Sequence, residues 1–207
     1  MLSMNQKEYW KTEWNKREAG SENNFARRIF SLIKSNHKKL LDLGCGDGRD
    51  SIYFAKKGLN VTSVDFSESG IKKLNEKIKR LRIKNINAVR ADIKKINFKD
   101  NSFDIIYAHL SLHYFDDKTT GKIFNNLYNI LNFGGLIFIK CKSTEDSLCG
   151  QGEKVGEDMY FKNHLHHFFS KDYMKEKLGK FKILGIRKTS SEYNLCKSSF
   201  IEAAATK

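Results

Sequence analysis

The stretch KKLLDLGCGDGRDSIYFAKKGLNVTSVD, from Lys38 to Asp65, decides the fold of this chain. It begins with an apolar run, turns through Gly44, Gly46 and Gly48, continues with an amphipathic segment, and ends with a second apolar run that Asp65 closes. A strand, a glycine turn, a helix and a second strand with a terminal carboxylate form a nucleotide-binding βαβ unit. Dinucleotide enzymes and enzymes that use other adenosine cofactors both build such a unit, so the chemistry of the loop has to distinguish them.

The rest of the chain repeats the alternation of strand and helix patterns. The helical periodicities fall at about 23–35, 50–58, 67–83 and 118–131, and Ser67 is placed to cap the third of them. The apolar runs rich in Ile, Leu, Val and Phe fall at 38–43, 59–65, 86–92, 103–110, 135–141, 181–189 and 198–207. We therefore expect one α/β domain: a doubly wound, mostly parallel, Rossmann-like seven-stranded sheet with helices on both faces and a C-terminal antiparallel hairpin. Within it, 1–22 is expected to be an N-terminal lid segment, 38–142 the cofactor-binding core, and 143–170 an insertion at the substrate rim.

The charge around the glycines argues against a pyrophosphate. Asp42, Asp47 and Asp50 outnumber Arg49 in and beside the loop, although the whole chain carries a net charge of +14. A pyrophosphate lies on the helix N-terminus, where carboxylates would repel it, and a dinucleotide loop would also have glycine or alanine at position 49. An acidic loop suits a ligand with an ammonium and a sulfonium, as in S-adenosyl-L-methionine. Asp65, 21 residues after Gly44, is placed to hold ribose hydroxyls.

The motifs also resemble a known family. DLGCGDG (42–48), VTSVDFS (61–67), RAD (90–92), FDIIYAHLSLHYF (103–115) and ILNFGGLIFI (130–139) are similar, in order, to the motifs of class I S-adenosylmethionine-dependent methyltransferases. The resemblance covers about 38–142 and is strongest to the small-molecule branch that includes tellurite-resistance and thiopurine methyltransferases. One departure is Phe133, where the family usually has proline. The resemblance implies S-adenosyl-L-methionine as cofactor and S-adenosyl-L-homocysteine as product.

The resemblance also implies which residues bind the cofactor: Asp42, Gly44, Gly46, Asp65, Phe66, Asp92, Ile93, Ala108 and His109. In the family pattern, backbone at Gly44 and at Ala108–His109 holds the methionyl ammonium. Asp65 takes the ribose hydroxyls, and Phe66 lies against the adenine. Asp92 accepts from the adenine amino group while Ile93 packs on the ring. Asp42 is expected to shape the loop through backbone amides.

Three segments offer side chains for the acceptor. Methyl transfer from a sulfonium mainly needs alignment, and it needs a base only when the nucleophile carries a proton. His113 and Tyr114 follow the fourth strand and are the catalytic candidates; His113 is equally interpretable as a packed histidine. Tyr9, Trp10 and Trp14 favour a lid over a helix that merely packs on the sheet edge. Cys149 and Tyr160 lie in the long 143–170 segment.

The histidines of YFKNHLHHFF (160–169) raise the question of a metal site. His164 and His166 would point the same way only on a strand, and no nearby cysteine or carboxylate pattern completes a tetrahedral set. We therefore expect no metal, and interpret this stretch as a short hairpin that leads to a helix capped by Ser170.

Composition limits the remaining possibilities. The lysines of 71–85 alternate with Ile71, Leu74, Ile78 and Leu81 at helical spacing, which favours a solvated helix face over a nucleic-acid footprint. We see no membrane span and no secretory signal, and the scattered cysteines are typical of reduced thiols in the cytoplasm. The expected partner is a small-molecule methyl acceptor, and the chain is expected to be a monomer or homodimer. The alternatives are an RNA or protein methyltransferase, a non-catalytic S-adenosylmethionine-binding protein and, least favoured, an NAD-linked oxidoreductase.

Overall fold

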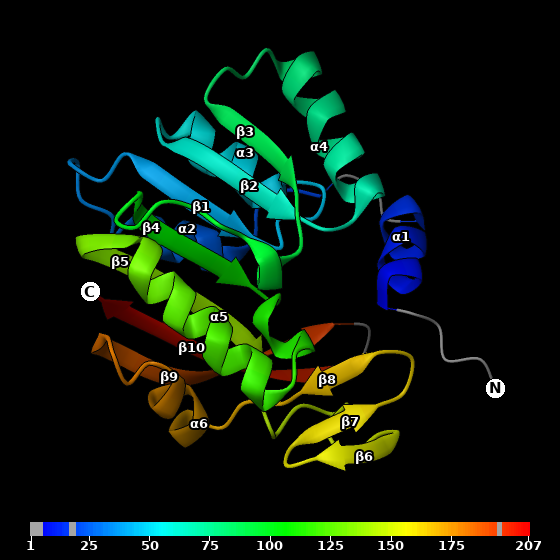
Figure 1. Ribbon diagram of the computed structural model, residues 1–207. Helices are drawn as coiled ribbons and strands as arrows, with labels where there is room; N and C mark the ends of the chain where they lie inside the picture. The colour runs from blue at the N-terminus through cyan, green and yellow to red at the C-terminus, as the bar shows by residue number, and fades with distance from the viewer. Residues whose placement is uncertain (1–5, 17–19, 194–195) are drawn as a thin grey trace.

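A mixed seven-stranded sheet forms the centre of the protein, whose computed structural model describes residues 6–16, 20–193 and 196–207 (Figure 1). The strand order is β3-β2-β1-β4-β5-β10-β9. The first five strands in this order are parallel, and β10 and β9 add to the edge as an antiparallel pair, which confirms the predicted fold. Their bounds are β1 Lys39–Leu43, β2 Asn60–Asp65, β3 Ile86–Arg90, β4 Phe103–His109, β5 Leu131–Lys142, β9 Lys182–Tyr193 and β10 Cys196–Thr206.

Helices cover both faces of the sheet. α5 (Asp117–Ile130) and α6 (Lys171–Lys177) pack on one face, and α2 (Asn24–Phe30) and α3 (Arg49–Lys56) pack on the other. α4 (Glu68–Leu81) lies against β2 and β3. Because side chains alternate along a strand, neighbours in β1 enter different cores: Leu41 lies in the core under α5 and Leu40 in the core under α2.

The helix starts follow from polar caps. Ser67 accepts a hydrogen bond from the Gly70 amide at the start of α4, and Ser170 accepts one from Tyr173 at the start of α6, as both were predicted to do. α2 is shorter than the predicted 23–35. Its fully buried residues end at Ile29, Leu32 beyond it is 58% exposed, and the helix ends at Phe30.

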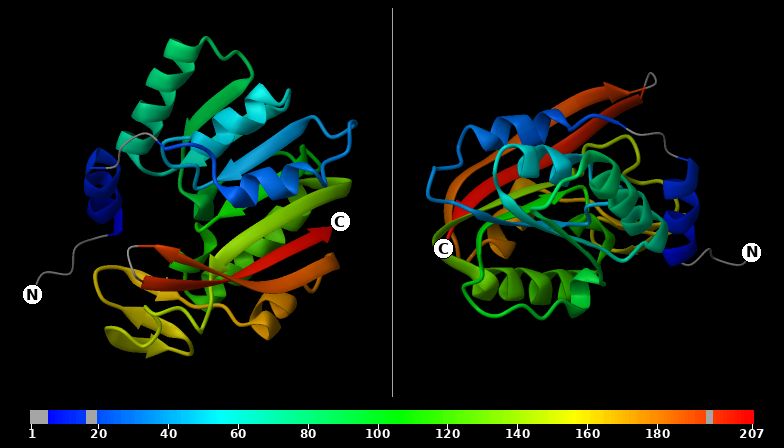
Figure 2. Two further views of the ribbon diagram at one scale, coloured as in Figure 1. Left: turned by 180° about the vertical axis from the view of Figure 1, so that it is seen from behind. Right: turned by 90° about the horizontal axis from the view of Figure 1, so that it is seen from above.

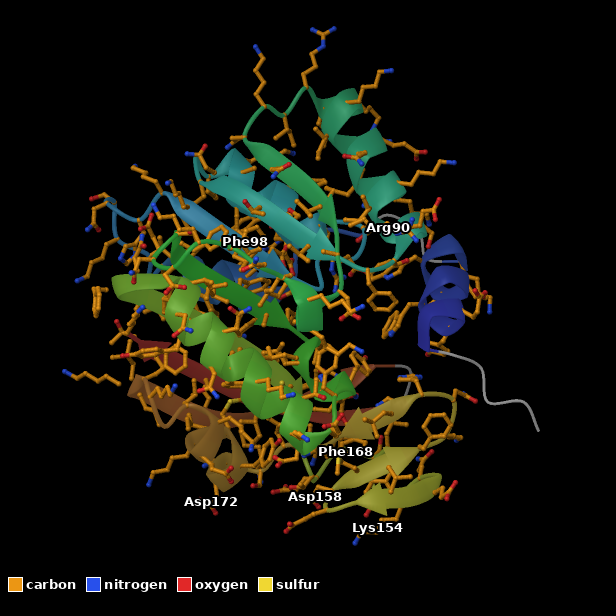
Figure 3. All side chains as sticks on the ribbon, in the orientation of Figure 1. Arg90, Phe98, Lys154, Asp158, Phe168 and Asp172 are labelled. Atoms are coloured by element: carbon orange, nitrogen blue, oxygen red, sulfur yellow. The ribbon has the colours of Figure 1, made fainter. Side chains whose placement is uncertain are left out.

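The 143–170 segment forms a small antiparallel sheet of its own. β7 (Met159–Phe161) and β8 (Leu165–His167) are the predicted hairpin, and β6 (Glu153–Gly156), which was not predicted, pairs with β7. Figure 3 shows Phe168 where this sheet meets the body of the protein and Lys154 at its outer side. Phe168 is 1% exposed and anchors the small sheet.

One further helix lies apart from the large sheet. α1 (Gln6–Lys16) stands beside the start of α4 and near the small sheet, at the edge where β1, β2 and β4 end (Figures 1 and 2). Within the described ranges, no helix is long and apolar enough to cross a membrane.

Candidate functional site

A cavity of about 270 Å³ lies where β1, β2 and β4 reach their carboxyl ends. This is the edge at which ligands bind in doubly wound sheets. The predicted residues in its wall are Asp42, Gly44, Asp65, Phe66, Asp92, Ile93, His109, Tyr114, Trp10 and Trp14. Residues that were not predicted to bind a ligand also line it: Cys45, Asp47, Arg49, Asp50, Tyr107, Leu110, Ser111, Phe115 and Lys142. The side chain of Ala108 is fully buried in the core, so only its backbone is available to a ligand.

The glycine loop is held in a conformation that a side chain would disrupt. The amides of Gly44 and Cys45 donate to the Val64 carbonyl at 2.7 and 3.1 Å. Gly44 has a φ of 71°, and a Cβ atom there would lie 2.4 Å from the Cβ of Ser111. Gly44 lines the cavity, and the lack of a side chain there lets Ser111 pack directly against its backbone.

Asp65 holds the loop from the end of β2. Its carboxylate accepts the Gly46 amide at 2.9 Å and the Ser67 amide at 2.7 Å, one on each oxygen. Burial raises the pKa of Asp65, and the two backbone hydrogen bonds oppose that rise. Each carboxylate oxygen has more than one acceptor position. Both oxygens can therefore still accept from hydroxyl groups of a ligand in the cavity.

Asp42 lies beneath the loop and is bonded differently from the prediction. Among the described residues it accepts from the Ser51 hydroxyl at 2.5 Å, and Ser51 accepts from Ser63 at 2.8 Å, whereas we expected backbone amides. The reason is that α3 returns Ser51 over the end of β1. Burial, together with repulsion from Asp50 and Asp65, raises the pKa of Asp42 to about 8. Asp42 is thus largely protonated at neutral pH.

This protonated carboxyl predicts a pH-dependent stability. The folded-state pKa lies above the unfolded value of about 3.9, so the contribution of Asp42 is full below about pH 4 and is lost as the pH rises toward 8. The limiting slope is about 1.4 kcal/mol per pH unit. Asp42→Asn keeps an oxygen for Ser51 but cannot ionise. Its free energy of unfolding, measured by urea denaturation from pH 5 to 8, should therefore rise relative to that of the original chain. A parallel pH dependence of the two proteins would contradict this, and Asp100→Asn, at an exposed carboxylate, is the control.

A second network joins α2 to the cavity wall. The Asp50 carboxylate accepts from the Asn23 backbone amide at 2.9 Å, from the Asn23 side-chain amide, and from the Tyr107 hydroxyl at 2.9 Å. Asn23 Nδ2 also lies 3.3 Å from His109 Nδ1. Burial, with repulsion from Lys140 and Arg49, lowers the pKa of His109 to about 3, so its imidazole is neutral. Sequence reasoning missed Asn23 and Tyr107 here; the only signal was Asp50, directly after the glycine turn.

The end of β3 supplies the far side of the cavity. Asp92 caps the short 3₁₀ helix η1 (Ile93–Lys95), where its Oδ1 accepts from the Lys94 amide at 3.0 Å. Ile93 is 6% exposed and presents an apolar surface beside Phe66 in the cavity wall. A carboxylate next to two apolar side chains suits a flat ring with an exocyclic amino group.

α1 covers the opening of the cavity. The ring of Trp14 lies over Gly46, where an added Cβ would meet it at 2.1 Å, and Lys73 of α4 donates to the Trp14 carbonyl. Trp10 contacts Tyr114 edge-on at 5.3 Å between ring centroids, and Tyr9 lies 4.3 Å from the ring of His164. The helix therefore contacts both the glycine loop and the opposite end of the site, which is the placement that a lid requires.

Three histidines gather beside Tyr114. His113 and His164 are 1% and 5% exposed, and the ring of His164, just before β8, lies 4.2 Å from that of His166, two residues further along the chain. Within the described part of the chain, both ring nitrogens of His113, both of His164 and Nδ1 of His166 are buried without a hydrogen-bond partner. Buried polar atoms are rarely left unpaired in proteins. These nitrogens are therefore candidates to bind a ligand.

The histidines are neutral. Burial, followed by repulsion from neighbouring imidazoles and Lys142, lowers the pKa of His113 well below its usual value. Burial is also the largest cause that lowers the pKa of His164 and of His166, each to about 4. Lys142 is itself paired with Asp146 at 2.7 Å. The cluster thus offers both donors and lone pairs at neutral pH.

Four residues predicted for catalysis, substrate or lid do not line the cavity: His113, which is buried behind Tyr114, Tyr9, Cys149 and Tyr160. Cys149 lies in the turn before β6, and Tyr160 packs edge-on against Phe168 at 6.0 Å in the small sheet. Across the described residues, no three His, Cys, Asp or Glu side chains are grouped as metal ligands. Tyr114 lines the cavity, and the rings of His113, His164 and His166 pack around it.

Comparison with known proteins agrees with this geometry. Residues 40–135 match the family described as "Methyltransferase domain". Over 112 residues the chain is 34% identical to "Probable S-adenosyl-L-methionine-dependent methyltransferase TehB" of Haemophilus influenzae, a match that covers 54% of this chain and 38% of TehB. It is 37% identical over 105 residues to "Phosphoethanolamine N-methyltransferase 1" of Triticum aestivum, covering 50% of this chain and 21% of the relative. The matches thus span less than two fifths of the length of these relatives.

Solved structures share the fold. The crystal structure of TehB from Haemophilus influenzae superposes with a TM-score of 0.72 at 23% identity, covering 97% of this chain and 66% of TehB. The Burkholderia thailandensis 1,6-didemethyltoxoflavin-N1-methyltransferase, solved with 1,6-didemethyltoxoflavin and S-adenosylhomocysteine bound, gives 0.70 at 18% identity, covering 90% and 79% of the two chains. At these identities the comparison shows the fold alone.

Proposed function

We propose that this chain, whose residues 40–135 match a methyltransferase domain, is an S-adenosyl-L-methionine-dependent methyltransferase that acts on a small-molecule acceptor held beside His113 and Tyr114. The observation that carries this proposal is the cavity that Asp65 and the glycine loop line at one end and Tyr114 at the other, with a group of buried histidines that have unpaired ring nitrogens packed behind Tyr114.

The residues of the cavity fit the cofactor. Asp50 and Asp65 line the cavity and suit a ligand with positive charge, the backbone of Gly44 borders the cavity, and Asp65 has lone pairs left for ribose hydroxyls. Asp92 would accept from the adenine amino group, between Phe66 and Ile93. When bound, S-adenosyl-L-methionine supplies a methyl group on a sulfonium, from which the acceptor displaces it. The backbone at Gly44 and at Ala108–His109 would hold the methionyl ammonium.

An acceptor bound at this end of the site would explain why these ring nitrogens have no hydrogen-bond partner. A polar acceptor bound between His113 and the pair His164 and His166 would supply the hydrogen bonds that these buried rings lack. Because burial lowers the pKa of His113 well below its usual value, the ring is neutral and can donate one hydrogen bond and accept another to orient the acceptor. Trp10 and Tyr114 would exclude water from the reacting atoms.

The size of the site favours a small acceptor. The cavity that the described residues form has a volume of about 270 Å³ and is lined in part by Trp10 and Trp14 of α1, which suits a small acceptor better than an RNA or protein chain. Two of the similar proteins are named for small molecules, phosphoethanolamine and 1,6-didemethyltoxoflavin. The identity of the acceptor in this chain, and whether it works as a monomer or homodimer, stay predictions to test.

The first experiment is calorimetric titration with S-adenosyl-L-methionine, with NADH as the comparison ligand. We expect saturable binding of the former and none of the latter, because the carboxylates of the loop repel a pyrophosphate. Transfer from methyl-labelled cofactor to a panel of amines, thiols, phenols and oxyanions then tests catalysis. Binding without transfer to any acceptor would favour a non-catalytic binding protein, and NADH binding would contradict the charge argument.

Replacing His113 separates the two ends of the site. Because His113 lies at the acceptor end, His113→Gln should leave cofactor affinity within about twofold of the original and lower kcat by about a hundredfold, the typical loss of a positioned acid or base. The pH profile of kcat should also change. Unchanged kcat with lowered stability would show that His113 only packs.

A further inference from the structure

A second, larger cavity lies on the other side of the molecule from α5. It has a volume of about 710 Å³ and lies between α2 and strands β5, β10 and β9. We call it the α2 groove and define it by Arg28, Leu32, Leu136, Leu184, Arg187 and Ala204. Its volume falls in the range of about 300–1,000 Å³ that small-molecule sites occupy. The methyltransferase reaction makes no use of it.

The groove exists because one face of the C-terminal hairpin is not covered. Ile201, Ala203 and Ala205 of β10 face the core beneath α6, so Glu202 and Ala204 face the opposite side. On that side α2 lies over the neighbouring strands, and Figure 2 (left) shows no helix over β9 and β10 among the described segments. Gly185, paired with Ala204, leaves the floor without a large side chain.

The mouth of the groove is apolar. Leu32 is 58% exposed and Leu184 is 56% exposed, and both line the groove. Leu136 and Phe138 of β5 continue the apolar wall inward. Large apolar side chains that gather at a concave surface mark a binding site more often than scattered ones do.

Positive charge surrounds this apolar surface. Glu202, 3% exposed, is the one carboxylate in the wall that the described residues form. It pairs with Arg28 at 2.7 Å, Arg187 at 2.9 Å and Lys140 at 3.1 Å. Three cations thus share one buried carboxylate, and Lys34 adds a fourth positive charge to the lining of the groove. Arg28 binds Glu202 through Nη2 only, so its other nitrogens point elsewhere.

We propose that the α2 groove is a second ligand site, which binds an anionic amphiphile with its apolar body on Leu32, Leu136 and Leu184 and its carboxylate or sulfonate on Arg28 and Arg187. The surplus of cations selects the sign of the head group, and the floor at Gly185 gives room for the body. The same charges oppose a second copy of this chain, since its net charge is +14.

The groove shares a wall with the cofactor cavity. Phe25 lines the groove and stacks on His109 at 5.9 Å, and His109 lines the cofactor cavity. Asn23, at the start of the same helix, binds Asp50 in that cavity. A ligand in the groove would therefore contact the helix that supports the cofactor site.

Dodecanoate below its micellar concentration is the probe, and dodecanol is its uncharged match. We expect calorimetry to show saturable one-to-one binding of dodecanoate and at least tenfold weaker binding of dodecanol, because a charge-assisted hydrogen bond accounts for about that factor. Gly185→Leu fills the floor, where an added Cβ meets nothing within 4 Å, and should weaken binding about tenfold or more. Gly121→Leu, also in open space but on α5, is its control.

A second pair of variants tests how much the positive charge of the groove contributes to dodecanoate binding. Arg187→Gln leaves Arg28 and Lys140 on Glu202 and should weaken dodecanoate binding about tenfold. Lys188→Gln changes the net charge equally, but Lys188 binds Glu145 outside the groove, so its affinity should stay within about twofold of the original. The proposal is overturned if dodecanoate does not bind, if dodecanol binds as well, or if each variant matches its control. Circular dichroism confirms that the variants are folded.

Discussion

Replacing Asp65 by alanine should weaken S-adenosyl-L-methionine binding by about a hundredfold or more. Hydrogen bonds to a charged group contribute about 1.5–3 kcal/mol each, and the carboxylate is placed to accept from two ribose hydroxyls. The change also removes the acceptor for the amides of Gly46 and Ser67, which hold the loop and the start of α4. Both effects act on the cofactor end, so binding should be lost even where the protein stays folded.

Asp104 offers a matched control for this experiment. Its carboxylate also accepts two backbone amides, those of Lys38 at 2.8 Å and Lys39 at 2.9 Å, but at the opposite end of the strands. Asp104→Ala should therefore lower the free energy of unfolding and leave the calorimetric affinity within about twofold of the original. Equal losses of affinity in both variants would mean that Asp65 acts only on the fold. If Asp65→Ala kept full affinity for S-adenosyl-L-methionine, Asp65 would not be a cofactor-binding residue.

Gly44→Ala should both destabilise the fold and abolish cofactor binding. The new Cβ would lie 2.4 Å from the Cβ of Ser111, and the φ of 71° is one that residues with side chains rarely adopt. We expect a loss of about 2–4 kcal/mol in the free energy of unfolding and no measurable cofactor binding, because the loop must move to relieve the clash.

Two comparison variants divide this effect into its parts. Gly58→Ala has a similar positive φ of 89° but meets nothing within 4 Å, so it should cost only about 1 kcal/mol and keep binding. Adding Ser111→Gly to Gly44→Ala removes the clash and should return the protein to the stability of Gly58→Ala. Denaturant unfolding and calorimetry measure both quantities. If Gly44→Ala and Gly58→Ala lost equal stability, backbone conformation alone would account for the loop.

The elements of the fold were readable from the sequence because their signals are local. β1 is a run of apolar residues beside a glycine turn, and α4 has apolar residues at helical spacing behind a serine cap. Such patterns depend on neighbours within a few residues along the chain. β6 was missed for the same reason: Glu153–Gly156 is short, mostly exposed and without apolar alternation, and it becomes a strand only by pairing with β7.

The part of the cavity lining at the glycine loop was predicted better than the part near Tyr114. Gly44, Asp65, Phe66, Asp92 and Ile93 belong to motifs at strand ends, and parallel strands bring their ends to one edge. The acceptor end depends on how a long insertion folds back. Cys149 and Tyr160 were chosen because they lie in that insertion, yet neither lines the cavity, since the turn before β6 and the packing of Tyr160 on Phe168 direct them elsewhere.

By itself, then, the sequence determined the βαβ order, the acidic glycine loop and the carboxylates that follow the strands, because each is written in residues close together in the chain. Only the tertiary structure decided the rest. It placed Asn23 on Asp50, protonated Asp42 by burial among other carboxylates, and brought His164 and His166 beside Tyr114. These contacts join residues tens of positions apart, and burial and charge repulsion exist only once the chain has folded around them.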